Sequence, residues 1–120
     1  MSGRKSYRRG RQGEDYAAHW LVEQGYQIRQ RNVRVAYGEL DLIAEKDGIL
    51  YFVEVKTRQN GLGQAAESLT PAKRVRMRQA AYGWLSKFYQ EEPAACFLIV
   101  LLQMDGSGQV LAREMFCSEL

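Results

Sequence analysis

Histidine, cysteine and long apolar runs are all scarce in this sequence of 120 residues. His19 is the only histidine and is expected to lie on the surface or in helix packing, so we expect no Ser-His-Asp or Cys-His set for nucleophilic catalysis. Cys96 and Cys117 are too few for a disulfide framework and too far apart for a metal knuckle, so we expect free, buried thiols. The longest apolar run, residues 97–102, is strand-sized. With no membrane span or signal peptide readable, we expect a cytoplasmic protein without a membrane partner.

The chain has no large excess of charge of one sign, since its net charge is +3, but the charged residues are unevenly distributed along the sequence. Residues 1–35 carry +5, residues 36–60 carry −2, residues 61–90 carry +4 and residues 91–120 carry −4. Basic segments on both sides of an acidic centre suit a polyanion, and the acidic centre suits a divalent cation. Solvated surface charge is the alternative interpretation of the same pattern.

The length suits one domain over residues 1–120, in which the basic residues 1–12 form a flexible arm. Apolar spacing predicts a helix over 13–24 and a second helix that is capped by Thr70-Pro71 and runs to about residue 89. Strands are expected at 26–35, 38–45, 49–57, 96–103 and 110–117, with a mobile glycine-containing loop at 59–66. This order, α-β-β-β-α-β-β, predicts an α/β protein with a mixed five-stranded sheet, because a strand, a helix and an apolar strand imply a parallel crossover.

The Asp47-Gly48 pair between two of these strands is typical of a two-residue hairpin turn. With the turn centred there, paired residue numbers sum to 95, so that Asp41 faces Glu54 and Glu39 faces Lys56. Alternation with period two places these four side chains on one face, beside Ile43 and Phe52. The opposite face is apolar or aromatic throughout and is expected to be core; it consists of Leu40, Leu42, Ala44, Tyr51, Val53 and Val55.

Asp41 and Glu54 form an unusual pair, because directly opposed side chains have Cβ atoms about 4.5–5.5 Å apart. Two carboxylates at that distance destabilise the sheet unless one is protonated or a cation bridges them. Mg²⁺ or Mn²⁺ would resolve the conflict, with the backbone carbonyl of Val55 as a further ligand. Lys56 would then offset charge on the phosphorus of a phosphodiester. The competing interpretation is a solvated face with a Glu39–Lys56 salt bridge, which leaves Asp41 against Glu54 unexplained.

The strings Gly38-Glu-Leu-Asp-Leu-Ile43 and Phe52-Val-Glu-Val-Lys-Thr-Arg58 resemble the YraN-like bacterial family. That family is similar to the Holliday-junction-resolvase-like members of the restriction-endonuclease-like (PD-(D/E)XK) superfamily, in which an Asp on one strand precedes Glu-x-Lys on the next. The resemblance extends from about Gly10, where Gly-x-x-Gly-Glu matches residues 10–14, to about Leu85. It implies a restriction-endonuclease-like fold and a metal-dependent nuclease.

By that resemblance the catalytic set is Asp41, Glu54, Lys56 and Glu14, and Glu14 reaches the site from the first helix. From the residues alone, Glu14 is equally explained as a first-turn acid favoured by the helix dipole. Glu39 would support the site. Basic residues that are candidates for contact with nucleic acid are Arg9, Arg11, Arg58, Lys73 and Arg76.

Two functions follow from these observations. The first is a Mg²⁺- or Mn²⁺-dependent nuclease that hydrolyses phosphodiester bonds in DNA, with branched or repair intermediates as substrates. The second is an inactive module that keeps the nuclease fold and only binds nucleic acid. A homodimer is a further hypothesis, by analogy with resolvases that cut two symmetric strands.

Overall fold

The central sheet of the computed structural model has five strands in the spatial order β1-β2-β3-β4-β5. The structure describes residues 2–36 and 38–120, and side chains from residue 11 onward within those ranges. Tyr37 and the side chain of Arg9 therefore lie outside the described part. The elements are α1 (Ser2–Glu23), β1 (Gln27–Val35), β2 (Gly38–Lys46), β3 (Ile49–Arg58), α2 (Leu62–Glu67), α3 (Pro71–Phe88), β4 (Ala95–Met104) and β5 (Val110–Ser118).

The strand directions confirm the predicted α/β fold with a mixed sheet. β1, β2 and β3 form an antiparallel meander, β4 lies parallel to β3, and β5 is antiparallel to β4. The crossover from β3 to β4 contains α2 and α3, so the order is the predicted α-β-β-β-α-β-β with one additional short helix. This arrangement is consistent with a restriction-endonuclease-like fold. No helix in the described ranges combines the length and apolar character that a membrane crossing requires.

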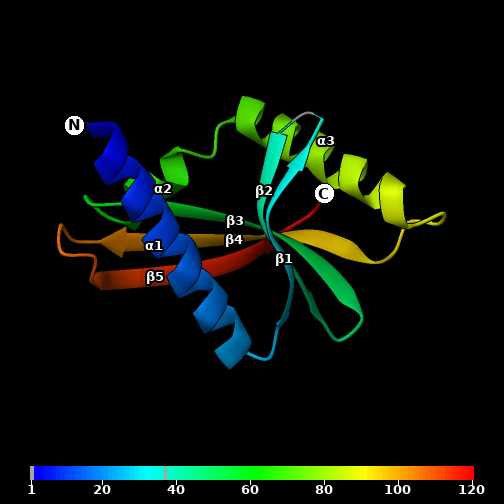
Figure 1. The fold of residues 1–120 in the computed structure, drawn as a ribbon, viewed down its shortest axis with the longest axis horizontal. Coiled ribbons are helices and arrows are strands. Elements are labelled where there is room, and N and C mark those ends of the chain that lie inside the picture. Colours follow the sequence, from blue (N-terminus) through cyan, green and yellow to red (C-terminus); the bar gives the residue numbers. More distant parts are fainter. Residues whose placement is uncertain (1, 37) are drawn as a thin grey trace.

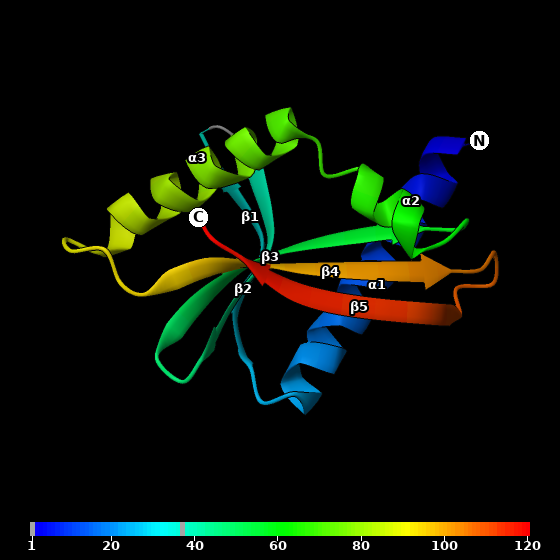
Figure 2. The ribbon, with the colours of Figure 1, turned by 180° about the vertical axis from the view of Figure 1, so that it is seen from behind.

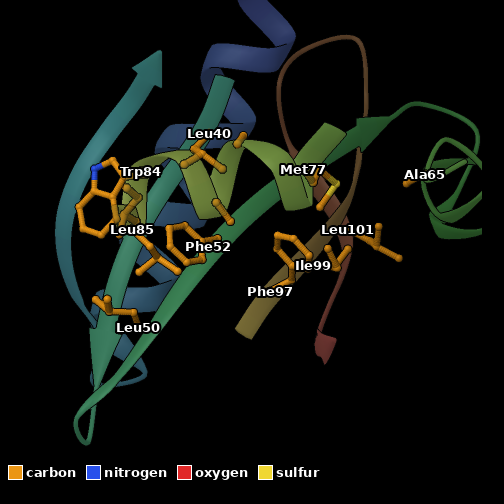
Figure 3. Packing of buried hydrophobic residues seen from close by; sticks show 13 residues of the cluster. Leu40, Leu50, Phe52, Ala65, Met77, Trp84, Leu85, Phe97, Ile99 and Leu101 are labelled. Carbon is orange, nitrogen blue, oxygen red and sulfur yellow. The ribbon is translucent and has the colours of Figure 1, made fainter. Parts of the chain in front are cut away.

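The helices cover opposite faces of the sheet, with α1 on one side and α3 on the other (Figures 1 and 2). Under α3, Phe52, Trp84, Leu85 and Phe97 belong to a cluster of buried side chains from β2, β3, β4 and the helices (Figure 3). A second cluster under α1 includes Leu21 and the apolar residues of β2, β3 and β4 that point the other way. Both faces of the sheet are therefore core, which explains why β4 is apolar at almost every position.

The β2–β3 hairpin has the predicted turn and register. Asp47 and Gly48 have φ of 52° and 79°, the left-handed values that a type I′ turn requires at both central residues. Paired residues run from Lys46–Ile49 to Leu42–Val53, and every pair sums to 95. The turn chemistry therefore determines which side chains of β2 and β3 share a face.

The prediction that Leu40 shares a face of the sheet with Leu42 is wrong. Leu40 packs under α3 together with Ile43 and Phe52, whereas Leu42 packs under α1. The alternation is reset at Asp41, opposite Asn32 of β1, whose φ of 51° departs from strand geometry. Asn tolerates this conformation better than most residues, so the kink occurs there. As a result, positions 40 and 43 lie on one face although a regular strand would separate them.

Two predicted segment boundaries are wrong. α1 begins at Ser2 and not near Gly13, so residues 2–12 extend the helix instead of forming a flexible arm. The segment is rich in Arg and Lys, which favour helix, and contains no proline. Residues 59–66 are not a mobile loop throughout, because α2 begins after Gly61 and buries Ala65. Here the glycine, with φ of 121°, precedes a helix rather than marking an unstructured loop.

The two cysteines are free, as expected, but they are not both buried. Cys96 is half-buried on β4 and Cys117 is exposed on β5. β5 lies at the edge of the sheet, so its side chains have fewer covering neighbours than those of β4.

Gly13 is required by the close approach of α1 to β3. A Cβ at this position would lie 2.2 Å from Oγ1 of Thr57, a distance that real contacts do not reach. Thr57 is itself buried, and its Oγ1 has no hydrogen-bond partner among the described residues. The contact brings the residue after Gly13, Glu14, toward the sheet.

We expect Gly13→Ala to lower the free energy of unfolding by about 1–3 kcal/mol, because the new methyl group overpacks the helix–strand contact. The matched control is Gly83→Ala in α3, where a Cβ meets nothing within 4 Å. That change should raise stability by about 0.5–1 kcal/mol through helix propensity. Denaturant unfolding of both variants, and of Gly13→Ala in a Thr57→Ala background, measures the effect; a loss that Thr57→Ala does not relieve contradicts this explanation.

Candidate active site

The strands β2 and β3 separate at Asp41, and this is a correction to the predicted pairing. The last backbone pair is Leu42–Val53, so Asp41 and Glu54 do not face each other as a regular cross-strand pair. Instead, the amide nitrogen of Val55 donates to Oδ2 of Asp41 at 2.8 Å. The Asp41 side chain thus takes the place that a backbone carbonyl of β2 would occupy in a continuous ladder.

Glu54 is the most deeply buried carboxylate of the site, with only 5% of the residue exposed. Two ammonium groups contact the same oxygen: Nζ of Lys56 lies 3.1 Å from Oε1 of Glu54, and Nζ of Lys73 lies 3.2 Å from it. Lys56 comes from the same strand, whereas Lys73 comes from the first turn of α3. A buried carboxylate requires such partners, because an isolated charge would be strongly destabilising.

Asp41 and Glu54 line one cleft of about 210 Å³ between the splayed strands and α3. The rest of its wall consists of Gly38, Glu39, Lys73, Arg76 and Met77. The start of α3 is set by Thr70, whose side chain accepts a hydrogen bond from the amide nitrogen of Lys73 at 3.2 Å. This cap places Lys73 at the cleft.

Burial, followed by the neighbouring charge of Glu54, raises the pKa of Asp41 to about 7, while the hydrogen bond from the amide of Val55 opposes the shift. Burial also raises the pKa of Glu14, with the charge of Glu39 as the next cause. The charge of Glu14 acts on Asp41 and that of Glu54 acts on Glu14, so α1 brings a third carboxylate within electrostatic reach of the site. Because α1 begins at Ser2, Glu14 is not a first-turn acid, and the dipole explanation for it is wrong.

The two lysines respond differently to the same carboxylate. Burial lowers the pKa of Lys56, although the charge of Glu54 partly offsets it. For Lys73, burial is the largest cause and acts to lower the pKa, but the interactions with Glu54, Lys56 and Asp41 together outweigh it and the pKa is raised. The site thus contains a carboxylic acid, Asp41, and an amine, Lys56, whose pKa values are both shifted by burial. Such shifts are frequent in functional sites.

The remaining predicted residues lie at various distances from this centre. Glu39 lines the cleft but pairs across the sheet with Arg34, and no ion pair of the described residues joins it to Lys56. Arg58 is half-buried and donates to the carbonyl of Thr57, outside the cleft wall. Arg11 is exposed on α1. The structure therefore brings together Asp41, Glu54, Lys56, Lys73 and Arg76, with Glu14 in electrostatic reach and Val55 contributing its amide.

Sequence reasoning missed the contact between Lys73 and Glu54. Lys73 was predicted to contact nucleic acid, yet in the structure it pairs with an acidic residue of the centre itself. The Thr70-Pro71 cap indicated where α3 begins, but not that its first turn lies over β3. The sequence predicts a crossover from β3 to β4, but it does not predict that Lys73 of α3 contacts Glu54.

The two carboxylates are the candidate ligands for the expected metal ion. No group of three or more His, Cys, Asp or Glu side chains among residues 2–36 and 38–120 is placed to hold one. Two carboxylates are nevertheless sufficient for Mg²⁺, which keeps several waters and is often bound by one or two carboxylates together with phosphates of the substrate. The hard oxygen donors of Asp41 and Glu54 therefore fit Mg²⁺ or Mn²⁺.

Comparison with known proteins gives the family. Residues 13–102, which include both site strands, match the sequence model of the Uncharacterised protein family UPF0102. The chain belongs to the UPF0102 family. The resemblance to the YraN-like family is thereby confirmed.

Several UPF0102 proteins are similar over most of their length. One from Symbiobacterium thermophilum is 40% identical over 109 residues, which cover 90% of this chain and 92% of the relative. Another, from Rhodococcus opacus, is 51% identical over 100 residues, covering 82% and 84% of the two chains. A third, from Corynebacterium efficiens, is 45% identical over 103 residues, covering 85% and 84%. The UPF0102 match thus includes Glu14, Asp41, Glu54, Lys56 and Lys73.

The raised pKa of Asp41 predicts how stability depends on pH in this UPF0102 protein. The folded state binds the proton more tightly than the unfolded chain, whose Asp titrates near 3.8. The stabilisation that protonated Asp41 contributes is fully present below about pH 4 and is lost as the pH rises through about 7. Asp41→Asn, which mimics the neutral acid, should remove the decline and stabilise the protein at pH 8 by on the order of a few kcal/mol. Urea unfolding in EDTA from pH 4 to 8 measures it; an Asn variant that is less stable at pH 8 contradicts the prediction.

Proposed function

We propose that this protein is a Mg²⁺- or Mn²⁺-dependent nuclease that hydrolyses phosphodiester bonds in DNA. The observation that carries the proposal is that Asp41 and Glu54 line one cleft and that Lys56 contacts the Glu54 carboxylate. Asp41 and Glu54 would hold the ion, and the Val55 carbonyl is the further ligand expected from the sequence. A bound divalent ion would polarise the phosphoryl oxygen and acidify a water molecule.

The residues of the chain would divide the remaining work. Lys56, whose side chain is only 14% exposed, lies where an ammonium group can offset the charge that develops on the phosphate. Lys73 and Arg76 line the same cleft and would hold the phosphates on either side of the reacting one. Glu14 would act on Asp41 from the α1 side, and its negative charge adds to the attraction for a cation. The proposal is supported by the cleft that Asp41, Glu54, Lys73 and Arg76 line together and by the contact of Lys56 with Glu54.

The competing proposal is a nucleic-acid-binding module without activity. The observation that favours it is the pair of ammonium groups that already neutralise Glu54. Such a module would bind DNA or RNA in a salt-sensitive manner that does not depend on divalent cations. The two functions therefore differ in how they respond to EDTA.

Cleavage assays with Mg²⁺ or Mn²⁺ on single-stranded, duplex, flap and four-way-junction DNA test the proposal. We expect cleavage of at least one substrate, and a loss of about 10²-fold or more in Glu54→Gln, Asp41→Asn and Lys56→Ala, because each removes a group that acts on the phosphate or its ion. Glu114→Gln, which neutralises an exposed residue on β5, is the matched control and should cut at the wild-type rate.

Absence of cleavage on every substrate, together with EDTA-insensitive binding, would identify the inactive module. Cleavage that survives in Glu54→Gln would contradict the assignment of the site. Circular dichroism and thermal unfolding of each variant separate loss of function from loss of fold.

The affinity for Mn²⁺ should also depend on pH through Asp41. The ion binds the carboxylate and not the acid, so the apparent affinity should rise about tenfold per pH unit below about 7 and level off above it. Isothermal titration with MnCl₂ between pH 5.5 and 8 measures this dependence. A flat profile from pH 5.5 to 7 would show that Asp41 is not a ligand.

A further inference from the structure

The Glu54 carboxylate has one more positive partner than its own charge requires. The ammonium groups of Lys56 and Lys73 both contact Oε1, although they repel each other. Lys73 is also attracted by Asp41, so the local set is two carboxylates and two ammonium groups. With all four groups ionised, this set sums to zero. The second lysine therefore balances the charge of the acidic pair and not of Glu54 alone.

The two lysines are not equivalent in their freedom to move. Lys56 lies on the same strand as Glu54, and its side chain is 14% exposed. The side chain of Lys73 is 31% exposed, comes from the end of a helix and lines the open cleft. Its four-carbon stem is flexible, so the ammonium group can swing outward while the backbone of α3 stays in place. Of the two partners, Lys73 is the one that can leave Glu54.

We propose that Lys73 is an exchangeable counter-ion, which occupies the position of the divalent cation on Glu54 and contacts substrate phosphate after the cation displaces it. This inference rests on the proposed function, because it concerns the same metal ion. In the absence of metal, Lys73 stabilises the fold by neutralising a buried carboxylate. After displacement, its charge is added to that of Arg76, which lines the same cleft.

This exchange makes nucleic-acid binding depend on prior metal binding. Before the exchange, the carboxylates and ammonium groups cancel, and the cleft has little attraction for a phosphate. Afterwards, two carboxylates, a divalent cation and Lys56 sum to +1, and the ammonium group of Lys73 stands beside them. A phosphodiester would then be bound at the centre only when the ion needed for its hydrolysis is present.

A fixed structural role for Lys73 makes the opposite prediction for its variants. If Lys73 only held α3 against β3, its removal would weaken metal binding and DNA binding together. As a counter-ion that competes with the metal, its removal should strengthen the first and weaken the second. Tighter metal binding together with weaker DNA binding in the same variant would therefore identify the exchange.

The test measures Mn²⁺ binding by titration calorimetry without nucleic acid, on the full chain. Lys73→Met keeps an unbranched side chain about as long as the four-carbon stem of lysine and removes the charge, and we expect it to bind Mn²⁺ about tenfold or more tightly than the wild type. Arg78→Met removes an exposed charge from the same helix outside the cleft, and it should change the affinity less than about threefold. In the presence of Mn²⁺, Lys73→Met should bind a 20-nucleotide DNA more weakly, with a salt dependence reduced by about one phosphate contact.

Mn²⁺ affinity that is unchanged or reduced in Lys73→Met overturns the exchange while leaving the metal site in place. If Lys73→Met does not fold, Lys73→Arg carries the test, because a guanidinium pairs with a carboxylate through two hydrogen bonds and should weaken Mn²⁺ binding. Unchanged or tighter binding in Lys73→Arg would also overturn the exchange. Absence of Mn²⁺ binding in the wild type and in both variants overturns the metal site itself, and the proposed function with it.

Discussion

The buried charge of Glu54 is the constraint on which the rest of this structure depends. A carboxylate with 5% exposure must be neutralised, and removing the partner of a buried ion pair typically destabilises a protein by about 3–5 kcal/mol. One partner comes from β3 and the other from α3, so the Lys73–Glu54 pair joins the helix to the sheet beside the apolar cluster under α3. The position of α3 and the chemistry of the cleft are therefore determined by the same contacts.

The separation of β2 and β3 turns this charge into a site. A continuous ladder would pair the backbone of Asp41 and leave no space between the strands. The kink at Asn32 of β1 resets the alternation of β2, the Asp41 carboxylate accepts a hydrogen bond from the amide of Val55, and a cleft forms between the strands and α3. An irregular strand pair, two carboxylates and a raised pKa each lower stability. Their occurrence together at one end of the β2–β3 pair is the pattern expected of a functional site.

The sequence predicted the features whose causes are local. Asp47-Gly48 determines the hairpin register, Thr70-Pro71 begins α3, and the apolar run of β4 reflects burial on both faces. It failed where the cause is distant in sequence or weak. The face of Leu40 depends on a kink in the neighbouring strand, and the Lys73–Glu54 contact depends on how the crossover packs. The early start of α1 was missed because charged residues without an apolar stripe give little helical periodicity, although their propensity is high. The acidic pair was found because two carboxylates on one face conflict with stability, whatever their exact geometry.

The two proposals about the site are linked by charge. In the structure the Lys73 ammonium group is held on Glu54, and Asp41, Glu54, Lys56 and Lys73 sum to zero when all four are ionised. In the proposed exchange, the two carboxylates gain the two positive charges of the cation and lose the one of Lys73. The centre therefore becomes more positive by one charge, and the displaced ammonium group of Lys73 adds its own charge at the open side of the cleft. A monovalent cation would only replace the charge of Lys73 and leave the centre neutral. The exchange therefore makes the centre itself attractive to phosphate only when the bound ion is divalent.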